Sequence, residues 1–93
     1  MVQAVWNGVV IAESDETVVL DGNHYFPESS VKSQYLTFSN HRTSDTVKGQ
    51  ARYFSLLVNG DMNPDAAWTY PEPGEAAAAI KGRIAFWKGV QVG

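Results

Sequence analysis

The chain has 93 residues, of which 44% are hydrophobic and 18% are charged, and its net charge at pH 7 is −3. This length fits one domain over residues 1–93, and the balance of apolar and charged residues argues against a disordered chain. The absence of cysteine excludes disulfides and thiolate zinc sites. Seven Lys and Arg residues spread along an acidic chain form no basic patch, so we expect no nucleic-acid partner.

The sequence contains no recognisable targeting or membrane signal. Its opening segment, Met1–Trp6, lacks the basic region and the apolar region of a signal peptide. No apolar run approaches the roughly 20 residues that a membrane-spanning helix needs. We therefore expect a cytoplasmic protein with no membrane partner, and the sequence leaves its oligomeric state unknown.

The first quarter of the chain alternates apolar and polar residues around two turn dipeptides. Asn7-Gly8 and Asp21-Gly22 are typical of hairpin turns, because both central positions of a type I′ turn need a positive φ. Pro27 ends this region, since proline cannot donate to a strand ladder. Trp6 alternates in phase with Ala4 and is expected in the core. The pattern predicts a four-stranded meander with strands over residues 2–7, 9–13, 17–20 and 23–26.

The rest of the chain alternates strand candidates with two short helix candidates. Glu28–Tyr35 favours a helix of at most two turns, and four consecutive alanines favour a second helix over Glu75–Lys81. Asn40-His41-Arg42 indicates a polar loop, and Asn59-Gly60 indicates another hairpin. The strand candidates cover residues 36–38, 50–58, 66–70 and 83–87. Strands joined by tight turns predict a mostly β fold, a compact sandwich or barrel-like domain with one short C-terminal helix.

Aromatic and cationic residues gather on the two strands of the later hairpin. Trp68 and Tyr70 are two residues apart and face one side of the sheet. Rings stack flat ligands and cations hold anionic groups, which predicts a binding site for a small anionic or aromatic ligand. The residues of this predicted site are Lys48, Arg52, Trp68 and Tyr70. Tyr53 is expected on the face opposite to Arg52. The alternative is that Trp68 belongs to the core and Lys48 caps a loop.

Catalytic and metal chemistry have less support in the sequence. His24 is flanked by Asp21 and Glu28, which keeps open a small hydrolase or transferase that uses His24 as an acid–base group. Glu13 and Asp15 stand two positions apart and are able to share a hard cation, although a solvated hairpin tip explains them more simply. We expect no catalytic residue, no metal and no cofactor. A protein-interaction domain that uses its sheet edges is the remaining alternative.

Several short motifs carry a family resemblance along nearly the whole chain. They are the opening segment Trp6–Ser14, Tyr25-Phe26-Pro27, Lys48-Gly49 with Ala51 and Tyr53 after it, and Ala66–Pro71. In these motifs the chain resembles the DUF427 family, whose members have no agreed activity. The resemblance implies a compact β-rich fold related in shape to the Mss4-like group.

The chain also departs from the family pattern. Family members typically show Cys-Pro-Trp before the Lys-Gly pair, whereas Ser44–Val47 precedes Lys48 here. Any chemistry carried by that cysteine or tryptophan is therefore missing, as is the Cys₄ zinc site common in the wider Mss4-like group. The family has carried a nucleotidyl-transferase label, but the chain has neither an Asp-x-Asp pair for Mg²⁺ nor a Gly-x-x-x-x-Gly-Lys loop. We therefore do not expect that activity.

Overall fold

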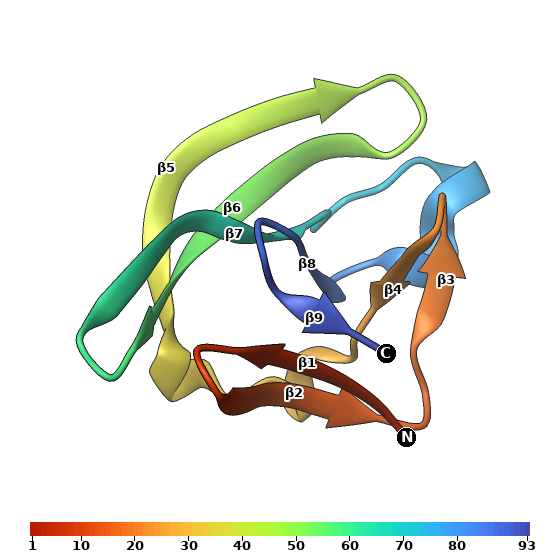
Figure 1. The fold of residues 1–93 in the computed structure, drawn as a ribbon. Coiled ribbons are helices and arrows are strands. Elements are labelled where there is room, and N and C mark those ends of the chain that lie inside the picture. Colours follow the sequence, from red (N-terminus) through yellow and green to blue (C-terminus); the bar gives the residue numbers. More distant parts are fainter.

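Nine strands and three short 3₁₀ helices make up the protein in a computed structural model that describes residues 1–93 (Figure 1). The strands are β1 (Val2–Trp6), β2 (Val9–Ser14), β3 (Val18–Leu20), β4 (Asn23–Tyr25), β5 (Leu36–Asp45), β6 (Gly49–Val58), β7 (Asp61–Thr69), β8 (Ile84–Phe86) and β9 (Gln91–Val92). The 3₁₀ helices are η1 (Glu28–Ser30), η2 (Ser33–Tyr35) and η3 (Glu75–Ile80). The predicted mostly β fold is therefore confirmed.

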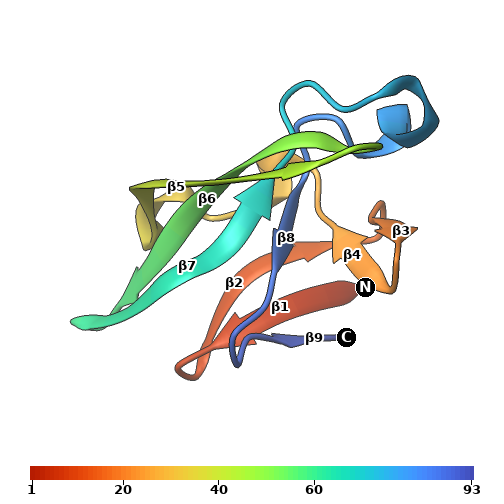
Figure 2. The same ribbon diagram turned by 90° about the horizontal axis from the view of Figure 1, so that it is seen from above.

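The strands form three antiparallel sheets, with the orders β2-β1-β9, β3-β4 and β5-β6-β7-β8. None of these sheets closes on itself, so the fold is not a barrel. Figure 2 shows the β5–β8 sheet and the β2-β1-β9 sheet as two layers, with β8 leading the chain from the first layer towards β9 in the second.

The hairpin turns lie at the predicted dipeptides. Asn7-Gly8 has φ values of 53° and 74°, Asp21-Gly22 has 51° and 78°, and Asn59-Gly60 has 51° and 82°. Positive φ at both positions is the requirement of a type I′ turn. The flanking strands pair directly across each turn, as Trp6 with Val9, Leu20 with Asn23, and Val58 with Asp61.

The first four strands do not form the predicted meander, because β2 and β3 lie in different sheets. The free edge of β2 is covered by a later segment instead. Lys32 N donates a hydrogen bond of 2.8 Å to the Ile11 carbonyl oxygen, and Ala12 bridges to Val31. Because β2 already has β1 on its other side, this contact leaves no edge for β3.

Two further local predictions change in form. Asn40-His41-Arg42 lies inside β5 and not in a loop, because β5 is an edge strand whose exposed side tolerates polar residues. The predicted short C-terminal helix is present as η3, which consists of 3₁₀ turns with a non-helical residue at Ala77. The helix predicted over Glu28–Tyr35 is divided into two separate 3₁₀ turns, η1 and η2. No helix of the structure is long and apolar enough to cross a bilayer.

Buried side chains form two clusters on opposite faces of the β5–β8 sheet. The larger cluster lies between the two layers and includes Phe26, Leu56 and Phe86, with Trp6 packed against it as a partly buried residue. The smaller cluster consists of Tyr25, Ala51, Tyr70, Ala77, Ile80 and Ala85. Tyr53 and Trp68 pack against this smaller cluster with part of each side chain still exposed.

Candidate functional site

The register between β6 and β7 decides which of the predicted site residues share a face. Tyr53 lies opposite Trp68, and Arg52 lies opposite Thr69. Directly opposed residues of an antiparallel pair point to the same side. Trp68 therefore shares its face with Tyr53. The predicted placement of Arg52 is corrected, because Arg52 points to the other face and lines a separate hollow with Gln50, Pro71 and Glu72.

Lys48, Trp68 and Tyr70 do lie together, around a cavity of about 220 Å³. The other lining residues come from the β3–β4 hairpin, from β6 and from the end of β8. They are Asp21, Asn23, Tyr25, Tyr53 and Trp87. We call the cavity formed by these eight residues the aromatic pocket. Whether it binds a ligand stays a prediction.

The rings of the aromatic pocket meet one another at steep angles. Tyr25 and Trp68 are 6.1 Å apart between centroids with an interplanar angle of 89°, and Trp68 and Trp87 are 5.9 Å apart at 79°. The pairs Tyr25–Tyr70 and Tyr53–Trp87 are tilted by 43° and 45°. These centroid distances are in the range of stabilising aromatic pairs, so the contacts between the rings hold them in place around the cavity.

Tyr25 is the most deeply buried residue of the aromatic pocket. Its side chain is 1% exposed, and its hydroxyl oxygen accepts a hydrogen bond of 3.3 Å from Trp68 Nε1. Burial is also the main cause that raises the pKa of Tyr25 and the pKa of Tyr70. Because the ordinary pKa of a phenol, 10.0, is already above physiological pH and both values are raised from it, Tyr25 and Tyr70 add no charge to the pocket.

Lys48 is a paired cation and not a free one. Its ammonium nitrogen lies 2.8 Å from a carboxylate oxygen of Asp21 and 3.3 Å from one of Asp45, and its side chain is only 16% exposed. The hydrogen bond to Asp21 is the main cause that raises the pKa of Lys48. Two carboxylates and one ammonium leave a net charge of −1. The expectation that Lys48 holds an anionic ligand therefore loses its electrostatic basis.

The turn between β5 and β6 positions Lys48. Asp45 accepts hydrogen bonds from the backbone nitrogens of Val47 and Lys48 at 2.8 and 2.9 Å, and these bonds lower the pKa of Asp45. Gly49 follows with φ 85°, and a Cβ atom added there would lie 2.9 Å from the carbonyl oxygen of Glu72. Only glycine suits both this backbone conformation and this close approach.

A bulge in β7 holds the outer wall of the pocket. Between the pairs Leu56–Asn63 and Phe54–Ala67, β7 has two more residues than β6. Asp65 lies in this bulge with φ 54°, and its carbonyl oxygen accepts a hydrogen bond from Trp87 Nε1. The sequence contained a signal for it, because a proline at position 64 inside a strand indicates a bulge.

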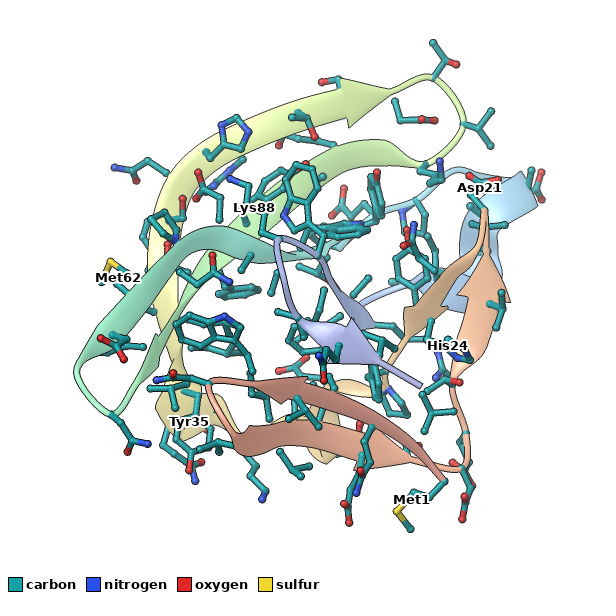
Figure 3. All side chains as sticks on the ribbon, in the orientation of Figure 1. Met1, Asp21, His24, Tyr35, Met62 and Lys88 are labelled. Carbon is teal, nitrogen blue, oxygen red and sulfur yellow. The ribbon has the colours of Figure 1, made fainter.

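The residues considered for catalysis are not assembled. His24 Nδ1 lies 2.8 Å from Thr17 Oγ1, and no hydrogen bond or ion pair joins His24 to Asp21 or Glu28. Figure 3 shows Asp21 at the tip of the β3–β4 hairpin and His24 nearer its base. Glu13 accepts a hydrogen bond from Gln3, and no group of three or more His, Cys, Asp or Glu side chains is placed to hold a metal ion.

A larger cavity of about 400 Å³ lies on the other face of the sheet, beside η1 and β5. Its walls include Phe38 and Phe54. It also contains Thr69, whose buried hydroxyl oxygen has no hydrogen-bond partner. This cavity is larger than the aromatic pocket, but two rings and one charged residue, Glu28, line it, whereas five rings and two charged residues line the aromatic pocket.

The family comparison covers the whole of the aromatic pocket. A family model described as a domain of unknown function, DUF427, matches residues 1–92. No curated protein matches the chain significantly. The match includes every residue that lines the pocket, and it confirms the resemblance carried by Lys48-Gly49 and Ala66–Pro71.

Proposed function

The chain belongs to the DUF427 family, a domain of unknown function, and we propose that it is a non-catalytic module that binds a small organic molecule in the aromatic pocket. The supporting observation is the convergence of five rings on one cavity. These rings come from β4, β6, β7, the residue after β7 and the residue after β8. Small-molecule binding sites are typically concave and lined by exposed aromatic rings.

The exposure of the rings supports binding over a purely structural role. Tyr25 and Tyr70 are buried, as core residues would be, but Trp87 is 45% exposed and Tyr53 and Trp68 are partly exposed. Aromatic rings that serve only to stabilise the fold contribute most to the free energy of folding when each ring is fully buried. Here the uncovered ring surface faces a cavity, where a ligand gains by covering it.

Catalysis has no comparable support. The aromatic pocket is lined by no histidine, serine, threonine or cysteine. Its one amine, Lys48, is kept protonated by Asp21, because that hydrogen bond raises the pKa of Lys48, and a protonated amine is not a nucleophile. His24 lies on β4 between the lining residues Asn23 and Tyr25, so strand alternation points it away from the pocket.

The proposal is tested by screening small molecules while the indole NMR signals of the three tryptophans are followed. We expect hits to shift the signals of Trp68 and Trp87 and to leave Trp6 unchanged, because Trp6 does not line the pocket. Removing one ring wall with Tyr53→Leu should weaken these hits by about three- to tenfold.

Tyr35→Leu is the matched control, since Tyr35 is also partly buried but packs against the larger cluster. It should leave the affinities unchanged. Hits that shift Trp6 alone would place the site elsewhere. Chemical conversion of a hit, abolished by His24→Ala, would favour the enzyme alternative.

A further inference from the structure

We propose that the ligand of the aromatic pocket is a small organic cation, an alkylammonium group that sits among the rings. This inference rests on the proposed function, because it names the ligand class of the same pocket. It differs from the anionic or flat ligand that the sequence indicates. The reasons are the angles between the rings and the charges around them.

The ring angles favour a compact ligand over a flat one. The four ring pairs formed between two pocket residues have interplanar angles between 43° and 89°. A flat ligand stacks best between nearly parallel rings, and no such pair is present. A tetrahedral ammonium group has substituents in several directions, so it contacts the faces of rings set at steep angles to one another. This arrangement is the aromatic cage that recognises alkylated ammonium groups.

The charges favour a cation over an anion. Asp21 and Lys48 are the charged residues that line the pocket, and the Lys48 ammonium is shared between Asp21 and Asp45. Asp21 uses Oδ2 for this ion pair, while its Oδ1 has no hydrogen-bond partner and its side chain is 65% exposed. Asp45 does not line the pocket, but with it the group of Asp21, Lys48 and Asp45 has a net charge of −1, which repels an anion and attracts a cation.

A cation–ring contact already exists at the outer wall of the pocket. The Lys88 ammonium lies 5.1 Å from the centroid of the Trp87 ring, within the range of a cation–π interaction. Lys88 does not line the pocket, and its ammonium donates to the carbonyl oxygen of Pro64. Figure 3 shows Lys88 well apart from Asp21, so Lys88 does not neutralise that carboxylate.

The size of the pocket limits the ligand to a small group. Its volume of about 220 Å³ is below the range of roughly 300–1,000 Å³ that is typical of sites for drug-sized ligands. A trimethylammonium head with a short substituent is of suitable size. The same head occurs in free metabolites and on methylated lysine side chains, so the test includes one probe of each kind.

The experiment compares choline with 3,3-dimethylbutan-1-ol, which has the same shape but a carbon atom in place of the charged nitrogen. Both are titrated by calorimetry into the full-length protein. We expect choline to bind about tenfold more tightly than the alcohol, because only choline gains the cation–π attraction. Asp21→Asn should weaken choline by about three- to tenfold and leave the alcohol unchanged, since it removes charge and keeps the shape of the side chain.

Two ring variants locate the site. Trp87→Leu should weaken choline, and Phe38→Leu is the matched control, because Phe38 is an exposed ring, 72% accessible, on the wall of the larger cavity. Thermal melts of both variants show whether each remains folded. The reverse pattern, in which only Phe38→Leu weakens choline, would overturn the proposal.

The remaining outcomes separate the inference from the proposed function. If the alcohol binds as tightly as choline and Trp87→Leu weakens both, the pocket binds small molecules but the cation inference is wrong. If neither compound nor any library compound binds, both are wrong. Tighter binding of N-acetyl-trimethyllysine amide than of choline would support the same ammonium chemistry with a protein side chain as its source.

Discussion

Among single residues, Lys48 has the environment that differs most from the one its sequence context indicates. A lysine beside tryptophan and tyrosine usually offers a free positive charge to a ligand. Here the ammonium group is held between Asp21, in the β3–β4 turn, and Asp45, the last residue of β5. In the sequence, Lys48 indicated a site for an anion. In the structure its charge is offset by two carboxylates, so the net negative charge around it favours the cation that we propose as the ligand.

The raised pKa values in the pocket predict a loss of stability at alkaline pH. The pKa of Tyr25 is raised above its ordinary 10.0, mainly by burial, and the pKa of Lys48 is raised above 10.5, mainly by Asp21. Both groups hold their proton to higher pH in the folded chain than in the unfolded chain. Their contribution to stability is therefore complete below about pH 10 and is lost as pH rises through the folded pKa values.

Tyr25→Phe tests this expectation, because it keeps the ring and removes the group that titrates. The urea midpoint is measured at pH 8 and at pH 11 for both proteins. The drop between the two pH values should be smaller in the variant, which still contains Lys48. Equal drops would show that burial of the Tyr25 hydroxyl does not contribute to the alkaline loss.

At the scale of elements, the bulge in β7 changes the pairing partner of Trp68 without changing its face. A regular hairpin counted back from the pair Val58–Asp61 would place Trp68 opposite Ala51. The bulge adds two residues to β7, so Trp68 moves to Tyr53, which lies on the same face as Ala51. An insertion of one residue would have turned Trp68 away from the pocket.

The close approach at the β5–β6 turn predicts an unequal cost for two glycine substitutions. Gly49 and Gly22 both have positive φ, at 85° and 78°, but only Gly49 lies against another backbone segment. Gly22→Ala should cost about 1–2 kcal/mol of unfolding free energy from backbone strain alone. Gly49→Ala should cost about 1–3 kcal/mol more, because its methyl group would meet the Glu72 carbonyl oxygen.

Urea denaturation of the two glycine variants checks the difference. A lower midpoint for Gly49→Ala than for Gly22→Ala is the expected result. Equal midpoints would mean that the segment around Glu72 moves aside without cost. In that case this contact would not be what positions Lys48.

At the scale of the whole molecule, the β5–β8 sheet has apolar residues on both faces, and the two faces have different roles. One face packs on the β2-β1-β9 layer and forms the larger cluster, while the other carries the smaller cluster and the aromatic pocket. A sheet covered on one face only would leave Tyr53 and Trp68 open to solvent. The β3–β4 hairpin supplies the partial cover, because Tyr25 packs in the smaller cluster and Asp21 reaches Lys48.

Trp6 packs against the first of these faces from β1 in the other layer, and its truncation should lower stability without affecting the pocket. Because Trp6 is partly buried, Trp6→Ala should cost about 2–3 kcal/mol, below the roughly 3–5 kcal/mol of a fully buried tryptophan. Phe38→Ala is the control and should cost less than about 0.5 kcal/mol, since Phe38 is exposed. Chemical denaturation measures both. An unchanged midpoint for Trp6→Ala would contradict its place in the core.

The amino-acid sequence by itself determined the turns and the strand character of the fold. Asn7-Gly8, Asp21-Gly22 and Asn59-Gly60 are hairpin turns in the structure because positive φ at two successive residues is a local requirement that few dipeptides meet. The sequence also determined the face of Trp68, since counting back from Asn59-Gly60 as a regular hairpin places Trp68 opposite Ala51, on the face that carries Tyr53 and not Arg52. The sequence also identified the family, through short motifs such as Lys48-Gly49 and Ala66–Pro71.

Only the tertiary structure decided how these elements meet. The edge of β2 pairs with Val31 and not with β3, and Tyr25 and Trp87 reach the pocket from segments far from Trp68 in the chain. Lys48 finds Asp21 from a turn 27 positions away, as their residue numbers show. Such contacts depend on how the β2-β1-β9 layer and the β3–β4 hairpin pack against the two faces of the β5–β8 sheet. This packing is a property of the whole chain that no local pattern contains.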